Sequence, residues 1–135
     1  RPRERRLIQA LRAGGARNTI LHICGDIRPI LADCALTGTN LIDIDWMVDM
    51  GEVIEHEEMR GAKVTARGNL NPAGVLLSRN PEDVVRESRK LIEANKSRGR
   101  FILSAGCNMS PASVPENLRA MVRAGEIYGR YSRPG

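Results

Sequence analysis

The feature that most limits the fold of this chain is the regular alternation of short apolar segments with amphipathic ones. Four segments are rich in aliphatic and β-branched residues and are predicted to be β-strands, at 19–24, 40–45, 63–67 and 100–106. A helix-like segment precedes the first strand, and another follows each of the four. Strands that alternate with helices form parallel sheets, because each helix returns the chain to the edge where the strands begin. The sequence therefore predicts an α/β protein with a four-stranded parallel sheet.

The predicted helices have recognisable starts. They lie at 3–13, 27–36 and 49–60, from Asn80 onward, and from Ser113 onward. Asn80 has the properties of an N-cap, Pro81 takes the first helical position, and acidic residues fill the first turn. Ser113 and Glu116 have capping-box spacing.

Two architectures fit this order of elements: an open doubly wound sheet and part of a (β/α)₈ barrel. No Gly-x-Gly-x-x-Gly fingerprint of a dinucleotide site follows any predicted strand. A full barrel needs about 250 residues, so residues 1–135 would form a single half-barrel segment of a longer domain. The barrel predicts sequential strand order with helices on one side. The doubly wound sheet predicts a reversal of strand order and helices on both faces.

Composition excludes several classes of protein. The net charge is +5, but the basic residues interleave with acidic ones on helical patterns and no aromatic platform accompanies them, so we expect no nucleic-acid partner. No apolar run approaches the roughly 20 residues of a membrane span, so we expect no membrane role. Three cysteines are an odd number for a disulfide framework and favour a reducing, cytoplasmic location.

Three residues indicate a metal site. His22 and Cys24 are two apart in a predicted strand, so their side chains share one face. Cys107 follows the fourth predicted strand after a glycine. One nitrogen and two sulfurs at strand ends match an open tetrahedral zinc site, which leaves a position for chemistry. In the alternative interpretation these residues are buried packing residues, since free cysteines are commonly buried.

Other polar residues near strand ends allow two readings each. Asp45 could be a fourth metal ligand, or it could hydrogen-bond a histidine that binds the metal, or it could be the N-cap of the segment beginning at Trp46. Asn69 could contact a substrate, or it could serve the backbone of a turn. We expect Cys34 in the core, and His56 on a solvated acidic face.

The sequence resembles the uroporphyrinogen decarboxylase superfamily over nearly its whole length, and more closely the zinc-dependent, corrinoid-linked methyltransferase branch of the methylcobalamin:coenzyme M type. The resemblance is carried by five blocks in the same order: His22-Ile23-Cys24-Gly25, Leu41-Ile42-Asp43-Ile44-Asp45-Trp46, Gly68-Asn69-Leu70-Asn71-Pro72, Gly106-Cys107 and Pro115-Glu116-Asn117. The decarboxylases lack His-x-Cys and typically carry histidine where Cys107 stands.

This resemblance implies the C-terminal half of a (β/α)₈ barrel. It also implies Zn²⁺ on His22, Cys24 and Cys107. Asp45 and Asn69 are candidates for binding the substrate, and Asn69 could also contact the corrin. The methyl group would pass between a corrinoid (cobalamin) held by a partner protein and a thiol, or it would come from a methylated substrate in the reverse sense. Two cysteinates and a neutral histidine make the protein–zinc unit formally neutral, so a thiolate substrate retains electron density for attack on a methyl group.

Two alternatives stay open at this point. A decarboxylase-like protein would have no corrinoid partner and no zinc. A non-catalytic half barrel would hold a structural zinc with four protein ligands. In every case a half barrel leaves two open sheet edges, so we expect either the missing half or a second copy of the chain as a partner.

Overall fold

The computed structural model describes residues 2–131, so both ends of the predicted 1–135 segment lie outside the described residues. The strands are β1 (Ile20–His22), β2 (Leu41–Asp43), β3 (Thr65–Leu70) and β4 (Phe101–Ala105). The helices are α1 (Pro2–Ala13), α2 (Leu31–Ala35), α3 (Met50–Glu55), α4 (Glu57–Gly61), α5 (Pro81–Asn95) and α6 (Pro115–Tyr128). Shorter helical turns are η1 (Arg28–Ile30), η2 (Pro72–Leu77) and η3 (Lys96–Arg98).

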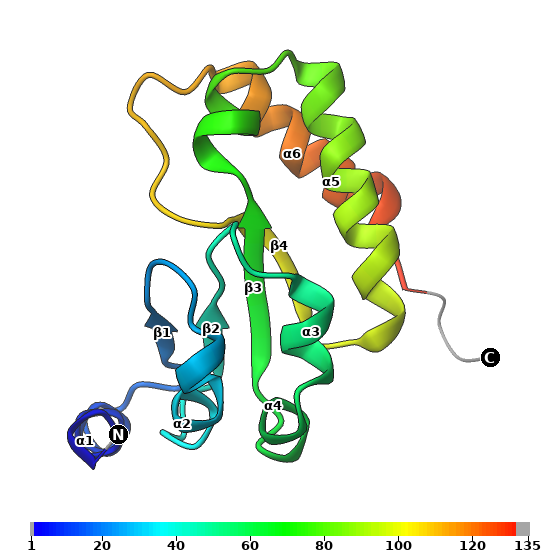
Figure 1. Cartoon of the computed structure of the whole chain (residues 1–135). Coiled ribbons are helices and arrows are strands. Elements are labelled where there is room, and N and C mark those ends of the chain that lie inside the picture. Colours follow the sequence, from blue (N-terminus) through cyan, green and yellow to red (C-terminus); the bar gives the residue numbers. More distant parts are fainter. Residues whose placement is uncertain (1, 132–135) are drawn as a thin grey trace.

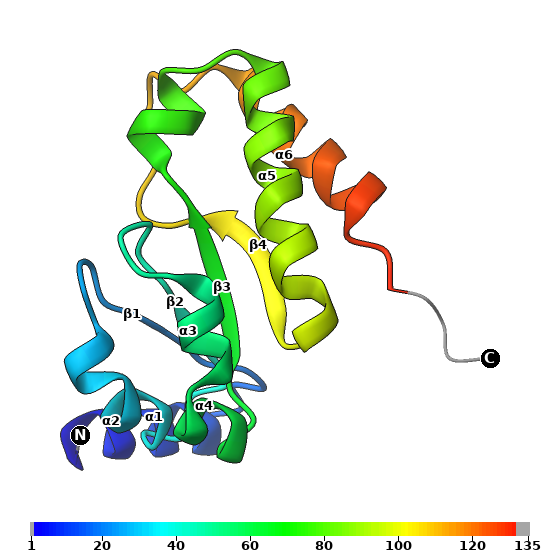
Figure 2. The ribbon, with the colours of Figure 1, turned by 45° about the vertical axis from the view of Figure 1, so that its right-hand side comes forward.

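The four strands form one parallel sheet in the order β1-β2-β3-β4. This confirms the predicted parallel sheet with alternating helices, and it shows no reversal of strand order such as a doubly wound sheet requires. In Figure 1, α1 lies at the lower end of the sheet, where the strands begin, and α5 and α6 lie side by side beyond β4. The second view shows the same arrangement (Figure 2).

The two faces of the sheet differ in burial. Ile42 and Ala66, which are register partners, are fully buried and belong to a core that also contains Leu31, Val53 and Met59 from the helices. On the opposite face Ile20 is 51% exposed and Ile102 is 43% exposed. Burial on one face only agrees with helices on one side of the sheet, as the barrel interpretation predicts.

A second, smaller core joins β3 to the last two helices. Leu70, Leu76, Val84 and Ala120 are buried together in it. Asn117, at the start of α6, is 1% exposed, and its amide nitrogen donates to the carbonyl of Leu76 at 2.9 Å. The hydrogen bond satisfies a buried donor and ties α6 to η2.

Several elements differ from the sequence prediction in extent. β3 continues to Leu70, beyond the predicted 63–67, because its last residues pair with β4. The predicted helix 49–60 is divided at His56, where ψ is 133° and the backbone is extended. Asn80 caps α5 as predicted, by accepting from the N–H of Asp83 at 2.9 Å. The predicted capping box at Ser113 does not cap α6, whose N-cap position is Val114.

The helices are short. The longest, α5, has 15 residues, whereas a bilayer-spanning helix needs about 20. Within residues 2–131 no helix has both the length and the apolar character to cross a membrane.

The open face predicts association. Because Ile20 and Ile102 are exposed there and β1 and β4 are unpaired edges, we expect the isolated chain at micromolar concentration to exceed monomer mass in light scattering. Ile102→Lys should reduce the association, whereas Val122→Lys, at a 57% exposed position on α6, should not. A soluble monomer that unfolds cooperatively would contradict this prediction.

Candidate metal centre

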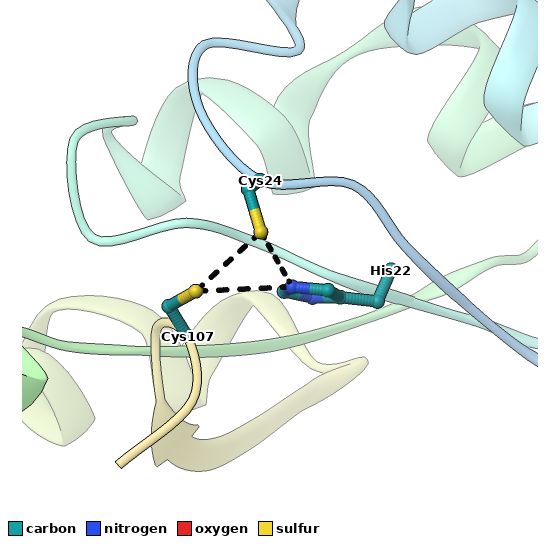
Figure 3. Close-up of side chains that lie close together, drawn as sticks. All are labelled: His22, Cys24 and Cys107. Carbon is teal, nitrogen blue, oxygen red and sulfur yellow. Dashed lines mark hydrogen bonds between the residues drawn. The ribbon is translucent and has the colours of Figure 1, made fainter. Parts of the chain in front are cut away.

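His22, Cys24 and Cys107 converge at the end of the sheet where the strands finish. His22 is the last residue of β1, Cys24 lies two residues later, and Cys107 lies two residues after β4. His22 Nε2 is 3.2 Å from Cys24 Sγ and 3.9 Å from Cys107 Sγ, and the two sulfurs are 3.5 Å apart (Figure 3). The ligand atoms of these three residues all lie within 4.8 Å of one another, close enough to bind one metal ion.

These distances fit a tetrahedral zinc ion. With Zn–S of about 2.3 Å and Zn–N of about 2.0–2.1 Å, a tetrahedral angle separates two sulfurs by about 3.8 Å and a sulfur from a nitrogen by about 3.6 Å. The observed S–S distance is 3.5 Å, and the two S–N distances of 3.2 and 3.9 Å lie on either side of the expected value. The donor set of one imidazole and two thiols is also one that zinc prefers.

The electrostatics of the site agree with a cationic occupant. The hydrogen bond with Cys107 raises the pKa of the Cys24 thiol, and desolvation and the negative charge of Asp45 act in the same direction. Two neighbouring thiols resist double ionisation because the second negative charge repels the first. A divalent cation reverses this balance and holds both sulfurs as thiolates.

Asp45 holds the turn that carries Cys24. It is 4% exposed and accepts hydrogen bonds from the N–H of Gly25 at 2.9 Å and of Met47 at 3.3 Å. Gly25 has φ of +85°, a conformation that favours glycine, so the chain can turn directly after Cys24. The contact with Met47 resembles that of an N-cap, but the segment that begins at Trp46 is a turn and not a helix, and Asp49 caps α3 by accepting from the N–H of Glu52. Substrate binding by Asp45 stays a prediction.

Gly106 allows the loop of Cys107 to approach the loop after β2. A Cβ atom at this position would lie 2.5 Å from the backbone nitrogen of Trp46 and 2.9 Å from its Cα. The Gly106 N–H also donates to the carbonyl of Leu70 at 2.8 Å. The glycine before Cys107 therefore has a packing role that brings the second sulfur to the site.

Asn69 lies within β3, not in the turn after it that the sequence predicted, because β3 extends to Leu70. Its side chain is 9% exposed, and its amide nitrogen donates to the carbonyl of Val48 at 2.7 Å and of Asp45 at 3.1 Å. The side chain thus supports the loop that contains Asp45. A contact with substrate or corrin stays a prediction.

The sequence analysis missed two residues beside the site. Asp43 is the register partner of both His22 and Arg67, on the open face of the sheet. Its carboxylate lies 3.8 Å from His22 Nδ1 and accepts from Arg67, and the hydrogen bond raises the pKa of Arg67. The sequence signal for Asp43 is the alternation of acids at 43 and 45. This signal points to His22 only once the register between β1 and β2 is known.

The remaining cysteine and histidine lie where the sequence predicted. Cys34 is 5% exposed in the core, and burial raises the pKa of its thiol. His56 is half-exposed, and its ring nitrogen lies 3.0 Å from a carboxylate oxygen of Glu58. Neither residue belongs to the His22, Cys24 and Cys107 group.

The chain is similar to known proteins of two kinds, methyltransferases and uroporphyrinogen decarboxylases. Residues 1–128 match the family described as uroporphyrinogen decarboxylase (URO-D). The methylcobamide:CoM methyltransferase MtbA of Methanosarcina mazei is 32% identical over 127 residues, which cover 94% of this chain and 35% of that protein. A uroporphyrinogen decarboxylase of Magnetococcus marinus is 28% identical over 112 residues, covering 83% and 30% respectively.

A solved structure supports the fold. A methyltransferase from Methanosarcina mazei superposes with a TM-score of 0.73 at 23% sequence identity, covering 93% of this chain and 36% of that one. The chain therefore spans about a third of the length of these relatives, rather than the half that the resemblance implied. Its position at the C-terminal end of a longer protein stays a prediction.

The ligand set predicts which cysteine matters for metal. Cys24→Ala should abolish retention of zinc, because it removes one of three donors, whereas Cys34→Ala should leave zinc content unchanged. X-ray fluorescence after gel filtration measures the metal. Zinc at wild-type level in Cys24→Ala would show that the metal lies elsewhere or is not held by these sulfurs.

The close approach at Gly106 makes a separate prediction. Gly106→Ala places a methyl group against the backbone of Trp46, so the loop must move and Cys107 with it. We expect a loss of about 1–3 kcal/mol in the free energy of unfolding, as for other overpacked positions, and weaker zinc binding in competition with a chromophoric chelator. Gly61→Ala, where a Cβ meets nothing within 4 Å, is the matched control. Equal zinc affinity in both variants would contradict this role.

Proposed function

The chain belongs to the uroporphyrinogen decarboxylase family, and from this premise we propose that it carries the metal centre of a zinc-dependent methyltransferase acting between a corrinoid and a thiol. The observation that carries the proposal is the convergence of one imidazole and two thiols from segments 83 positions apart. The methyltransferases among the relatives, whose names specify methylcobamide and CoM, support the same class of reaction.

The residues of the chain have defined tasks in this proposal. His22, Cys24 and Cys107 would hold Zn²⁺ and leave one side of the site open, since His22 and Cys24 are exposed. When bound, zinc would lower the pKa of a thiol that reaches this open side. Asp45 keeps the Cys24 turn in place through the N–H of Gly25. Neither Cys24 nor Cys107 pairs in a disulfide, so both sulfurs are available to bind a metal ion.

The rim of the site offers apolar surface for a corrin ring. Trp46 is 47% exposed and Met47 is 54% exposed, both on the loop that Asp45 begins. The backbone of Trp46 lies close to Gly106, which precedes Cys107, so the loop that carries these side chains borders the metal centre. Exposed apolar side chains near a thiol-activating site are suited to a large macrocycle presented by a partner protein. The same surface serves methyl transfer in either direction.

The open sheet face supports the larger architecture. We infer that the four β-α units are a segment of a (β/α)₈ barrel, with the exposed face of the sheet directed to the barrel interior and the metal centre at the carboxyl ends of the strands. The barrel would be completed by further chain or by a second copy. Free thiols at an exposed site favour a reducing compartment, so we propose a cytoplasmic location.

A decarboxylase-like function without zinc is the second candidate. Uroporphyrinogen decarboxylases of several bacteria are 28–31% identical to parts of this chain, close to the values for the methyltransferases. The three donor atoms within 4.8 Å of one another favour the zinc enzyme, because one imidazole and two thiols match the donor set of an open zinc site.

Metal content and methyl transfer together separate these functions. The purified chain, in the assembly found by light scattering, should hold about one zinc per site and methylate 2-mercaptoethanesulfonate from methylcobalamin, with the product identified by mass spectrometry. Cys107→Ala should lose both properties by at least about tenfold, and Cys34→Ala should keep both. Zinc without methyl transfer would favour a structural metal, and turnover of uroporphyrinogen by a zinc-free chain would favour the decarboxylase.

A further inference from the structure

A row of polar side chains crosses the open face of the sheet behind the metal centre. The parallel register pairs His22 of β1 with Asp43 of β2, and Asp43 with Arg67 of β3. Register partners project to the same face of a sheet. The imidazole, the carboxylate and the guanidinium therefore form a continuous line over three strands.

The contacts along this line have a direction. Arg67 donates through Nε and Nη2 to the two carboxylate oxygens of Asp43. This two-point contact fixes the plane of the carboxylate. Asp43 Oδ2 lies 3.8 Å from His22 Nδ1, close enough for the negative charge of the carboxylate to act on that ring nitrogen. The other ring nitrogen, Nε2, lies 3.2 Å from Cys24 Sγ.

The imidazole therefore lies between a carboxylate and the two sulfurs. A neutral imidazole carries one proton on either nitrogen, and the nitrogen that binds a metal must be the one without it. A carboxylate beside Nδ1 favours the proton there, and it leaves the lone pair of Nε2 directed to the sulfurs. We propose that Asp43, held by Arg67, is a positioning residue that fixes His22 as the Nδ1–H tautomer. The functional role of this tautomer rests on the proposed metal function.

Arg67 limits what Asp43 can do. Asp43 is 15% exposed, so water screens its charge only in part. Two cysteinates and this carboxylate would place three negative charges around one cation, and Arg67 offsets one of them. Because both oxygens of Asp43 already accept from Arg67, the carboxylate is held back from the ligand position. The pair can orient the histidine without adding charge to the site.

The tautomer can be measured without metal. The chain has two histidines, so His56→Gln assigns the signals of His22 in long-range ¹H–¹⁵N NMR. The spectra are recorded at about pH 8.5, because only a neutral imidazole has two tautomers. We expect mainly Nδ1–H for His22 in the wild type, a shift toward Nε2–H in Asp43→Ala, and an intermediate ratio in Asp43→Asn, which keeps a neutral acceptor.

A matched control and a second readout complete the experiment. Asp83→Asn removes a carboxylate from an arginine pair on α5, and it should leave the His22 tautomer unchanged. Zinc affinity, measured by chelator competition, should fall about 10–100-fold in Asp43→Ala, less in Arg67→Leu, and not in Asp83→Asn.

The outcomes separate this inference from the proposed function. An unchanged tautomer in Asp43→Asn and Asp43→Ala would overturn the positioning role, whatever the zinc affinities. If circular dichroism shows that Asp43→Ala is unfolded, Asp43→Asn decides. A wild-type chain that shows the Nδ1–H tautomer, loses it on substitution of Asp43, and binds no zinc would support the positioning role and overturn the metal function.

Discussion

Parallel pairing in sequential order is the constraint on which the rest of this structure depends. Each strand starts at the same edge of the sheet, so each also finishes at the same edge, and the residues that follow the strands meet there. His22 finishes β1 and Cys107 follows β4 by two residues, and their ring nitrogen and sulfur lie 3.9 Å apart although 85 positions of chain separate them. Local sequence contributes the pair His22 and Cys24, and the sheet brings Cys107 into their neighbourhood.

The turns after the strands convert this coarse convergence into a site. Strand ends alone bring residues to one region, whereas a metal ligand set requires atoms within a few ångströms. Asp45 and Asn69 supply that precision through the main chain, by binding the N–H of Gly25 and the carbonyls of the loop after β2. Gly106 supplies it by the absence of a side chain next to Trp46. Asp45 and Asn69, which the sequence suggests as ligand or substrate-binding residues, thus hold in place the main chain near the metal ligands.

What the sequence could predict follows from how far each signal reaches along the chain. Periodicity and caps are local, so the strands, the cap at Asn80 and the closeness of His22 and Cys24 could be predicted, although β1 ends at His22 and Cys24 lies beyond the strand that was predicted to hold both. The extension of β3 to Leu70 depends on pairing with β4, and the Asp43–Arg67 pair depends on register between strands. Pairing between strands cannot be predicted from one segment of sequence. For this reason the sequence predicts a turn at Asn69 and does not indicate Asp43 as a site residue.

The face that carries the chemistry is also the face that the helices leave uncovered. His22, Asp43 and Arg67 share it with Ile20 and Ile102, so one surface holds both the polar row and exposed apolar side chains. Exposed apolar side chains favour burial of this face against further chain or a second copy. Charged side chains oppose such burial unless their charges are paired. Arg67 and Asp43 are already paired with each other while the face is open, so burial of the face would leave neither charge without a partner. Completion of the fold and preparation of the site are therefore compatible on one surface, and the pairing of a single arginine with a single aspartate makes them so.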